Sequence, residues 1–186
     1  MTARHELAPT GIPSAVAANV AAQIPTLMSD ALMLRAPKVE DFPLYAEVLC
    51  SERGQYMGGP ISREDAWSGF VQLASSWMLH GHGGWTIEDV DSGDALGFVI
   101  LGLEPGDVQI KLGFLVSEGN EGLGIAHEAA QMARAFAFDT LQLTELASYV
   151  HKNNARSIAL AERLGGASTA HESDMLAYIY TSEAAQ

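Results

Sequence analysis

The sequence contains a single cysteine, Cys50, so no disulfide bond can form within the chain. Cysteine and histidine do not recur at any spacing typical of a zinc site, and no metal is expected. In its sequence context Cys50 is interpreted as a small buried hydrophobic residue in a helix. A lone cysteine is typical of a reducing compartment, and we expect a cytoplasmic protein.

Basic residues are also scarce. Ten Lys and Arg stand against 23 Asp and Glu, which gives a formal net charge of −13. Such a charge repels phosphate backbones and anionic lipid surfaces, so nonspecific binding to nucleic acid or to a membrane surface is disfavoured. A cationic partner or substrate is electrostatically favoured instead.

No long hydrophobic run is present either. Residues 7–29 carry no charge, but three prolines and several polar side chains interrupt them, so the segment predicts neither a signal peptide nor a membrane span. We expect residues 1–26 to form an N-terminal extension with one or two helical turns within 14–23. Residues 27–186 are expected to form one domain around a single core, because no break in composition divides them.

The first half of this domain shows the periodicities of an α+β protein. A strand is expected at 31–35, followed by a helix that Asp41 caps. Ser62 is expected to cap a second helix. The apolar positions of that second helix recur at helical spacing and are Trp67, Phe70, Val71, Ala74, Trp77 and Met78. Apolar runs on both sides of the turn DSGD predict a β-hairpin, and a further strand is expected at 108–116.

The second half alternates helices and strands. A helix is expected over about 122–139, a strand over 145–150 and a last strand over 175–180. An Asn pair at 153–154 can cap a helix that stops at Gly165. A strand, a crossover helix and a parallel strand within an otherwise antiparallel sheet predict a mixed α+β fold.

Two glycines, Gly122 and Gly124, stand where the first of these helices begins. Backbone N–H groups at a helix N-terminus favour a phosphate, and glycine lets an anion approach them. A glycine-rich connection without any ligand is the competing interpretation, and the spacing alone does not decide between the two. A P-loop is excluded because no GK[ST] follows, and a Rossmann fingerprint because His127 occupies its third glycine position.

Two motifs in a fixed order make a family resemblance specific. EGLGIA (121–126) follows a strand that ends in LGFLV, and NNARSIALAERLGG (153–166) lies at the next strand-to-helix junction. The pair resembles the acyl-CoA core of the GNAT N-acetyltransferase superfamily. IPTLMSDALMLRAPKVEDFPLYAEVL (24–49) resembles the opening of its subgroup that includes ribosomal-protein N-terminal acetyltransferases. The resemblance implies a mostly antiparallel sheet with a central parallel pair splayed around acyl-CoA, and helices on both faces.

The resemblance also implies a site for acetyl-CoA. The pantetheine arm would lie between the two parallel strands, bonded to the backbone near Leu115 and Val116. Asn154 would contact the pantetheine amides, a role compatible with a plain N-cap. Ser157 would lie near the sulfur and is the candidate catalytic residue. The pyrophosphate would be held by the backbone N–H groups of Gly122, Leu123, Gly124, Ile125 and Ala126.

Several positions depart from the family pattern. Glu121 stands where Arg or Gln is usual, and Leu123 where a basic residue is frequent, so phosphate affinity is expected to rest on the backbone. Removing the charge with Glu121→Gln is then expected to leave binding unchanged or to improve it. Lys111 replaces a frequent glutamate, and Ala161 replaces the tyrosine that serves as the acid in many relatives.

The acid and the base therefore cannot be assigned from the sequence. The candidate proton acceptors are Glu104, Glu145 and His151, each of which is equally suited to a solvated surface position. The candidate aromatic residues for an acceptor pocket are Trp85, Tyr149 and Tyr178, for which a place in the core competes.

The sequence thus predicts an acetyl-CoA-dependent N-acetyltransferase. An acetyl group would pass to a primary amine, of a protein N-terminus or a small molecule, by direct attack on the thioester. Positioning and carbonyl polarisation can carry this reaction, because a thiolate with a conjugate-acid pKa of about 8 to 9 leaves without strong acid catalysis. The competing hypothesis is a CoA-binding or regulatory module that has lost catalysis. No nucleic-acid or membrane partner is expected, and a homodimer stays open.

Overall fold

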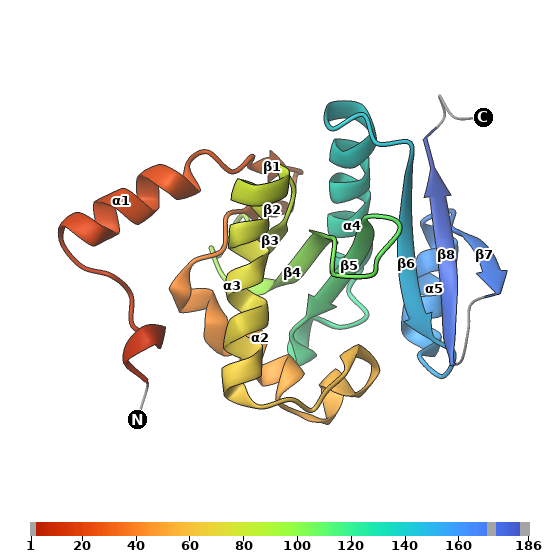
Figure 1. Ribbon diagram of the computed structural model, residues 1–186, viewed down its shortest axis with the longest axis horizontal. Coiled ribbons are helices and arrows are strands. Elements are labelled where there is room, and N and C mark those ends of the chain that lie inside the picture. The colour runs from red at the N-terminus through yellow and green to blue at the C-terminus, as the bar shows by residue number, and fades with distance from the viewer. Residues whose placement is uncertain (1–2, 171–173, 183–186) are drawn as a thin grey trace.

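One sheet of eight strands organises the chain in the computed structural model, which describes residues 3–170 and 174–182 (Figure 1). The strand order is β1-β2-β3-β4-β5-β6-β8-β7, and every neighbouring pair is antiparallel except β5 and β6. The strands are β1 (Leu27–Met28), β2 (Leu32–Arg35), β3 (Gly84–Asp89), β4 (Ala95–Gly102), β5 (Lys111–Val116), β6 (Glu145–His151), β7 (Ala167–Ala170) and β8 (Met175–Thr181). The predicted mixed sheet with one central parallel pair is confirmed.

Helices cover both faces of the sheet, as predicted (Figure 1). Helices α2 and α3 pack on the face that carries Phe98 and Leu115, and α4 packs on the face that carries Val99 and Leu112. Helix α5 contributes to the same cluster of buried residues as α4. The α-helices are α1 (Ile12–Ala21), α2 (Phe42–Leu49), α3 (Arg63–His80), α4 (Ile125–Ala135) and α5 (Ala155–Arg163). The shorter helical turns are η1 (Arg4–Glu6), η2 (Val39–Asp41), η3 (Glu52–Met57), η4 (Glu118–Asn120) and η5 (Phe136–Thr140).

The apolar run of β4 explains its place in the middle of the sheet. Phe98 faces α2 and α3, whereas Val99 and Leu101 face α4, and all three side chains are completely buried. A strand covered on both faces needs apolar side chains at consecutive positions, whereas a half-exposed strand alternates. The segment ALGFVILG therefore specifies a strand between two layers of helices.

Helix α3 is rotated relative to the predicted stripe. Val71 and Met78 belong to the stripe of apolar positions found in the sequence but are exposed at 44% and 76%, so that stripe as a whole is not the buried face of the helix. The close approach of β3 explains the rotation, because a Cβ on Gly84, the first residue of β3, would lie 2.8 Å from the Leu73 Cβ. This approach draws the Leu73 side of the helix onto the sheet. The buried positions of α3 are Ala66, Phe70, Leu73 and Ser76.

Asp41 precedes α2 as predicted, but its side chain does not cap that helix. Its carboxylate accepts hydrogen bonds from both terminal nitrogens of Arg35, at 2.7 and 2.9 Å, and from the Thr86 hydroxyl at 2.7 Å. The Lys38 N–H donates to the same carboxylate at 2.8 Å. Burial alone would raise the pKa of Asp41, and these hydrogen bonds outweigh burial and lower it. A buried polar cluster thus fixes the start of α2 to the sheet.

Some predicted boundaries hold and others shift. Ser62 caps α3 by accepting from the Asp65 N–H at 3.0 Å, and Gly165 ends α5 with a φ of 79°. Helix α4 begins at Ile125 rather than at 122 and continues into a single π-helical turn. Strand β5 starts at Lys111 rather than at 108. The short strands β1 and β7 were not predicted, because neither is long enough to show an alternating pattern.

Cys50 also lies outside its predicted helix. It follows the last residue of α2 as the C-cap, and its side chain is half-buried rather than enclosed. Among the described residues no group of three or more His, Cys, Asp or Glu side chains is placed to hold a metal ion. In that same part of the chain, no helix combines the length and the apolar character needed to cross a membrane.

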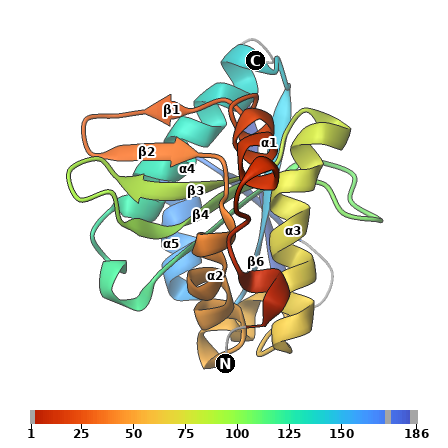
Figure 2. The ribbon, with the colours of Figure 1, turned by 90° about the vertical axis from the view of Figure 1, so that its left-hand side faces the viewer.

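The N-terminal extension forms a longer helix than predicted. Helix α1 spans ten residues, none of them buried, and stands apart from the sheet (Figures 1 and 2). The segment before it is attached to α3, because Arg63 donates to both carboxylate oxygens of Glu6, at 2.7 and 2.8 Å. The segment after it is attached to β3, because the Trp85 indole N–H donates to the Pro25 carbonyl at 2.7 Å. Residues 1–2 of the extension, and 171–173 and 183–186 of the domain, lie outside the described residues.

Candidate active site

The parallel strands β5 and β6 pair at a single position and then separate (Figure 1). Lys111 is opposite Ala147, whose N–H donates to the Ile110 carbonyl at 3.0 Å. One residue further along each strand, the Ser148 hydroxyl donates to the Leu112 carbonyl at 2.6 Å. We call the diverging ends, residues 113–116 of β5 and 149–151 of β6, the fork. Residues 113–116 still pair with β4 and 149–151 with β8, but the backbone groups of β5 and β6 that face each other across the fork form no ladder beyond Lys111 and Ala147. Except for the Val116 carbonyl, which accepts from Arg53, they are the backbone groups to which a ligand can bond.

Alternation of the backbone decides which residues of β5 face β6. The Ser117 N–H donates to the Leu96 carbonyl at 2.9 Å, so the polar backbone groups of Ser117 and Leu115 face β4. Those of Phe114 and Val116 face β6. Of the two backbone positions expected for pantetheine, the structure thus places Val116 on the fork and turns Leu115 toward β4. Phe114, which was not predicted from the sequence, also presents its backbone to the fork. The predicted start of β5 was three residues too early, so the sequence could not give the alternation needed to find it.

Residues 117–124 lead from the fork into α4, and we call this segment the glycine loop after Gly122 and Gly124. Gly122 and Gly124 have φ values of 78° and 88°, and a Cβ on either would meet no atom within 4 Å. The positive φ angles explain the glycines even without a ligand. The first N–H groups of α4, from Ile125 onward, have no partner within the helix and carry the positive end of its dipole. Leu123 projects outward and is 69% exposed. The loop therefore offers an open, positively polarised surface suited to an anion.

Helix α5 begins on the other side of the fork. Asn154 is its N-cap, and the Asn154 Oδ1 accepts from the Ser157 N–H at 3.2 Å. Both side chains are partly exposed. The predicted N-cap is confirmed. The side-chain nitrogen Nδ2 of Asn154 and the hydroxyl of Ser157 make no hydrogen bond to the described residues. The structure thus brings Asn154, Ser157, Val116 and the glycine loop to one end of the sheet.

Glu121 lies between two arginines rather than beside an open phosphate site. Arg53, from η3, donates through Nη2 to Glu121 Oε1 at 2.6 Å and to the Val116 carbonyl at 2.8 Å. Arg156, in the first turn of α5, donates to the other oxygen of Glu121. The hydrogen bond from Arg53 is the main reason why the pKa of Glu121 is lowered. We call these three side chains the mouth cluster, and its formal charge is positive.

Lys111 is held in an acidic cage at the closed end of the fork. Its Nζ lies 2.5 Å from Glu104 Oε2 and 2.9 Å from Asp107 Oδ2. Burial alone would lower the pKa of Lys111, but the hydrogen bonds to these carboxylates outweigh it and raise the pKa. Lys111 stands where a glutamate is frequent in the family. Carboxylates are nevertheless present beside this position, because the loop after β4 supplies Glu104 and Asp107.

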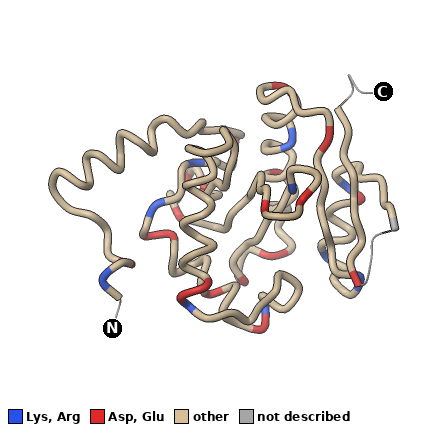
Figure 3. The backbone as a smooth tube through the Cα atoms, viewed as in Figure 1, with Lys and Arg blue, Asp and Glu red and all other residues tan. Residues whose placement is uncertain are grey.

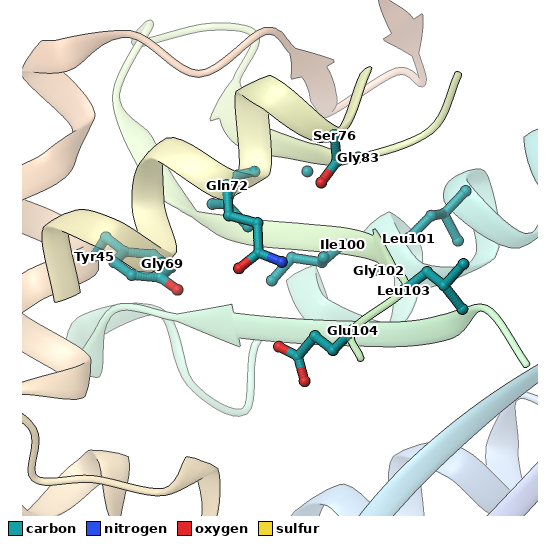
Figure 4. Close-up of a pocket in the computed structure, with 12 residues that line it drawn as sticks. Tyr45, Gly69, Gln72, Ser76, Gly83, Ile100, Leu101, Gly102, Leu103 and Glu104 are labelled. Carbon is teal, nitrogen blue, oxygen red and sulfur yellow. The ribbon is translucent and has the colours of Figure 1, made fainter. Parts of the chain in front are cut away.

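Glu104 also borders a pocket between α3 and the end of β4. Figure 4 shows Tyr45, Gln72 and Glu104 around this pocket, from α2, α3 and the segment after β4. Burial and then the Glu104 charge raise the pKa of Tyr45 to about 12, so its hydroxyl stays protonated. The pocket lies on the face of the sheet that α2 and α3 cover, and Ile100 of β4 forms part of its lining.

The other candidate groups fall into different surroundings. Trp85 and Tyr178 are buried in the core, whereas the Tyr149 hydroxyl donates to Gln109 Oε1 at 3.2 Å. His151 lies at the open end of the fork with its ring 5.1 Å from that of Tyr56. Glu145 is exposed at the start of β6, at the opposite end of that strand.

Comparison with known proteins agrees with this architecture. The sequence model of the acetyltransferase (GNAT) domain family matches residues 31–167. An acetyltransferase from Agrobacterium tumefaciens C58 is 36% identical, with a TM-score of 0.81, over 86% of this chain and 95% of that one. The chain therefore belongs to the GNAT acetyltransferase family. It is an enzyme of the acyltransferase class.

Two further solved structures share the fold at lower identity. The ribosomal-protein-S5-alanine acetyltransferase from Vibrio fischeri is 13% identical, with a TM-score of 0.68, over 87% of this chain and 99% of that one. The ribosomal L7/L12 alpha-N-protein acetyltransferase RimL, solved in complex with coenzyme A, is 18% identical, with a TM-score of 0.70, over 87% and 98% of the two chains. At these identities the likeness shows a shared fold.

Proposed function

We propose that this enzyme transfers the acetyl group of acetyl-CoA to a primary amine, of a protein N-terminus or a small molecule, by direct attack on the thioester. The observation that carries the proposal is the fork. Its two strands pair at one position only and open toward the glycine loop at the N-terminus of α4. An extended pantetheine chain can add to such unpaired strand edges, and a diphosphate can bind the helix N-terminus beyond them.

Each proposed contact uses a group with capacity to spare. The Val116 N–H would donate to a pantetheine amide, since the Val116 carbonyl already accepts from Arg53, and Leu115 would lie beside it. Asn154 would reach the pantetheine amides through its side-chain nitrogen. The left-handed glycines leave space for a diphosphate at the loop. The N–H groups that would hold it belong to Gly122, Leu123, Gly124, Ile125 and Ala126.

The transfer needs a neutral amine held close to the thioester carbonyl. Its nitrogen attacks the carbonyl carbon, and a backbone N–H of the fork polarises the carbonyl oxygen during formation of the tetrahedral intermediate. Collapse of the intermediate breaks the carbon–sulfur bond and releases the CoA thiolate. The amine loses its proton to water or to a nearby carboxylate. Ser157, in the first turn of α5, would pass its hydroxyl proton to the departing thiolate and recover a proton from that water, so that no alkoxide is left.

The pocket beside Glu104 is the proposed entrance for the amine. It opens on the face opposite α4, so acceptor and donor would approach the fork from two sides. The Glu104 carboxylate, which Lys111 already holds at 2.5 Å, and the Gln72 side chain offer hydrogen-bonding partners for an amine. The acidic residues, whose positions are marked in red along the backbone in Figure 3, also favour a cationic acceptor.

A catalytically silent CoA-binding module is the second candidate. The observation in its favour is Ala161, a completely buried methyl group at the position that holds an acid in many relatives, which supplies no functional group here.

We place the enzyme in the cytoplasm, since its lone cysteine suits a reducing compartment. Residues 27–186 would form its catalytic domain. Neither candidate function requires the protein to form a homodimer.

One experiment separates these candidates. Purified protein is incubated with acetyl-CoA and a panel of amines and N-terminal peptides, while isothermal titration measures the binding of coenzyme A. Release of free thiol that depends on the amine supports the transferase. Binding of coenzyme A without turnover on any acceptor supports the silent module, and absence of binding refutes both.

A further inference from the structure

Arg53 reaches the fork from a segment far away in the sequence. It belongs to η3, where its N–H donates to Ser51 Oγ at 3.3 Å. The turn around it is tightly built, because a Cβ on Gly54 or on Gly59 would lie 2.8 or 2.6 Å from the Leu49 carbonyl oxygen. The turn thus packs directly against the end of α2, and Arg53 extends from it to β5.

The guanidinium of Arg53 is only partly satisfied. Its Nη2 donates to Glu121 and to the Val116 carbonyl. Its Nη1 is buried and makes no hydrogen bond to the described residues, and the nearest oxygen of Glu47 is 3.7 Å away. Glu47 is close enough to form an ion pair with Nη1 but too far to accept a hydrogen bond from it. A buried donor without a hydrogen bond is unfavourable, and an arriving anionic oxygen would remove that penalty.

Arg156 is held differently. Its side chain is 81% exposed, and in the described part of the chain its guanidinium contacts only Glu121. Glu121 uses one carboxylate oxygen for each arginine, so a single acidic side chain sets the position of two guanidinium groups from different elements. The two arginines lie on either side of the glycine loop. In that loop, Leu123 stands at a position where a basic residue is frequent in the family.

We propose that Arg53 and Arg156 bind the phosphate groups of the acyl-CoA, and that Glu121 is the positioning residue that holds both guanidinium groups at the mouth of the fork. This inference rests on the proposed function. Guanidinium groups match phosphate oxygens in a two-pronged geometry that backbone N–H groups alone do not provide. A local positive charge is also needed, because a chain with a net charge of −13 otherwise repels a polyanionic cosubstrate.

The proposal reverses the expectation for Glu121→Gln. From the sequence alone the carboxylate is a liability next to a phosphate, and its removal is expected to be neutral or favourable. In the structure the carboxylate is already neutralised by two arginines, and its removal releases both. Weaker binding of the phosphate-bearing cosubstrate is the expected result.

The test compares variants on three acetyl donors. Glu121→Gln, Arg156→Gln and Arg53→Lys are assayed with acetyl-CoA, with acetyl-dephospho-CoA and with S-acetylpantetheine, which lacks the diphosphate and the nucleotide. Arg4→Gln, in the exposed N-terminal segment, is the matched control for loss of one positive charge. Circular dichroism and thermal unfolding verify folding, which Arg156→Gln should preserve because of its exposure.

We expect KM for acetyl-CoA to rise about tenfold in Glu121→Gln and Arg156→Gln, with kcat within about twofold of the parent, since a charged contact to the ligand is lost. KM for S-acetylpantetheine should stay unchanged. Combining the two substitutions should add little to either alone, because Glu121 acts through the arginines. The KM of Arg53→Lys for acetyl-CoA should lie between that of the parent and those of the other two variants. An effect retained with acetyl-dephospho-CoA assigns the contact to the diphosphate, and an effect lost with it assigns the contact to the 3′-phosphate.

Two results would overturn the inference. Folded variants with the parental KM for acetyl-CoA would show that the cluster does not contact the cosubstrate. An equal rise in KM for S-acetylpantetheine would show that the cluster only holds the loop in shape. If the parent protein itself neither binds coenzyme A in titration nor uses any of the donors, the proposed function fails rather than this inference.

Discussion

The Ser148 hydroxyl donates to the Leu112 carbonyl at 2.6 Å and accepts a hydrogen bond from the Tyr180 hydroxyl at 3.2 Å. This side-chain bridge lies one residue beyond the single backbone pairing of β5 with β6. It satisfies a carbonyl that the separating strands would otherwise leave buried without a donor. The bridge therefore marks the point from which the two strands diverge.

Replacing this serine should weaken the fold at its centre. Ser148→Ala leaves the Leu112 carbonyl and the Tyr180 hydroxyl without their partner in a buried site, and we expect a loss of about 1 to 3 kcal/mol in the free energy of unfolding. Urea denaturation measures this loss. Ser148→Thr keeps the hydroxyl and serves as the control. A variant as stable as the parent would mean that the bridge contributes nothing to the fork.

The glycine loop is tested by a substitution that its backbone tolerates. Valine at Gly124 is unsuitable because a φ of 88° strains a branched residue, at a cost of about 1 kcal/mol or more. Asparagine adopts this conformation more readily, so Gly124→Asn should fold and place its side chain where a phosphate would approach. We expect the affinity for coenzyme A to fall at least about tenfold, or ~1.4 kcal/mol, in isothermal titration.

Gly93 provides a matched control for this substitution. It has a φ of 75° in the hairpin turn between β3 and β4, and a Cβ there also meets no atom within 4 Å. Gly93→Asn should therefore reproduce the backbone effect of the substitution without touching the loop. Equal affinity of Gly124→Asn and the parent would identify the loop as a connection that binds no phosphate.

Ser157→Ala tests the proposed proton donor. Its backbone N–H keeps the hydrogen bond to Asn154, so the N-cap and the fold should be preserved. Because the thiolate leaves fairly well unaided, we expect kcat to fall by about 100-fold at most, with little change in the affinity for coenzyme A. Steady-state kinetics and titration give the two values. An unchanged kcat would remove Ser157 from the mechanism.

The buried Asp41 cluster predicts a pH-dependent stability. The pKa of Asp41 is lowered in the folded state, so its ionised form stabilises the protein above the ordinary aspartate pKa, and this contribution is lost as the pH falls through the lowered value. At pH 7, Asp41→Asn should cost about 3 kcal/mol, because Arg35 loses a buried partner. Denaturation curves at pH 7 and pH 3 should show a smaller difference between parent and variant at the lower pH. A difference independent of pH would contradict this account.

Removal of residues 1–21 tests the proposed domain boundary. No side chain of α1 is buried, and the Trp85 bond to Pro25 remains in the shortened protein. We expect cooperative unfolding and unchanged binding of coenzyme A, measured by thermal denaturation and titration. Loss of either property would place the N-terminal segment within the functional domain.

Local patterns in the sequence were sufficient for the order of the elements. The apolar run of β4, the serine before α3 and the positive φ glycine after α5 are each specified by residues close together in the chain. The parallel pair follows from that order, because a strand, a helix and a strand connect most simply by a crossover. The glycine loop and the Asn154 cap were found for the same reason.

Tertiary packing decided which side of each element is used. The face of α3 that is buried depends on how closely β3 approaches it, and Val71 was therefore misplaced. Leu115 and Phe114 are neighbours in the sequence but present their backbone to opposite strands, so an uncertainty of one residue reverses the assignment. Aspartate is a residue type that often caps helices, yet the carboxylate of Asp41 binds the buried Arg35 instead of the N-terminus of α2.

The sequence by itself determined the family, the fold and the loop suited to a phosphate, because these depend on backbone conformations that neighbouring residues encode. Only the tertiary structure decided the electrostatics of that loop. Glu121 meets Arg53 across 68 positions of the chain and Arg156 across 35. Contacts between residues so far apart depend on the packing of whole elements, which leaves no local pattern in the sequence.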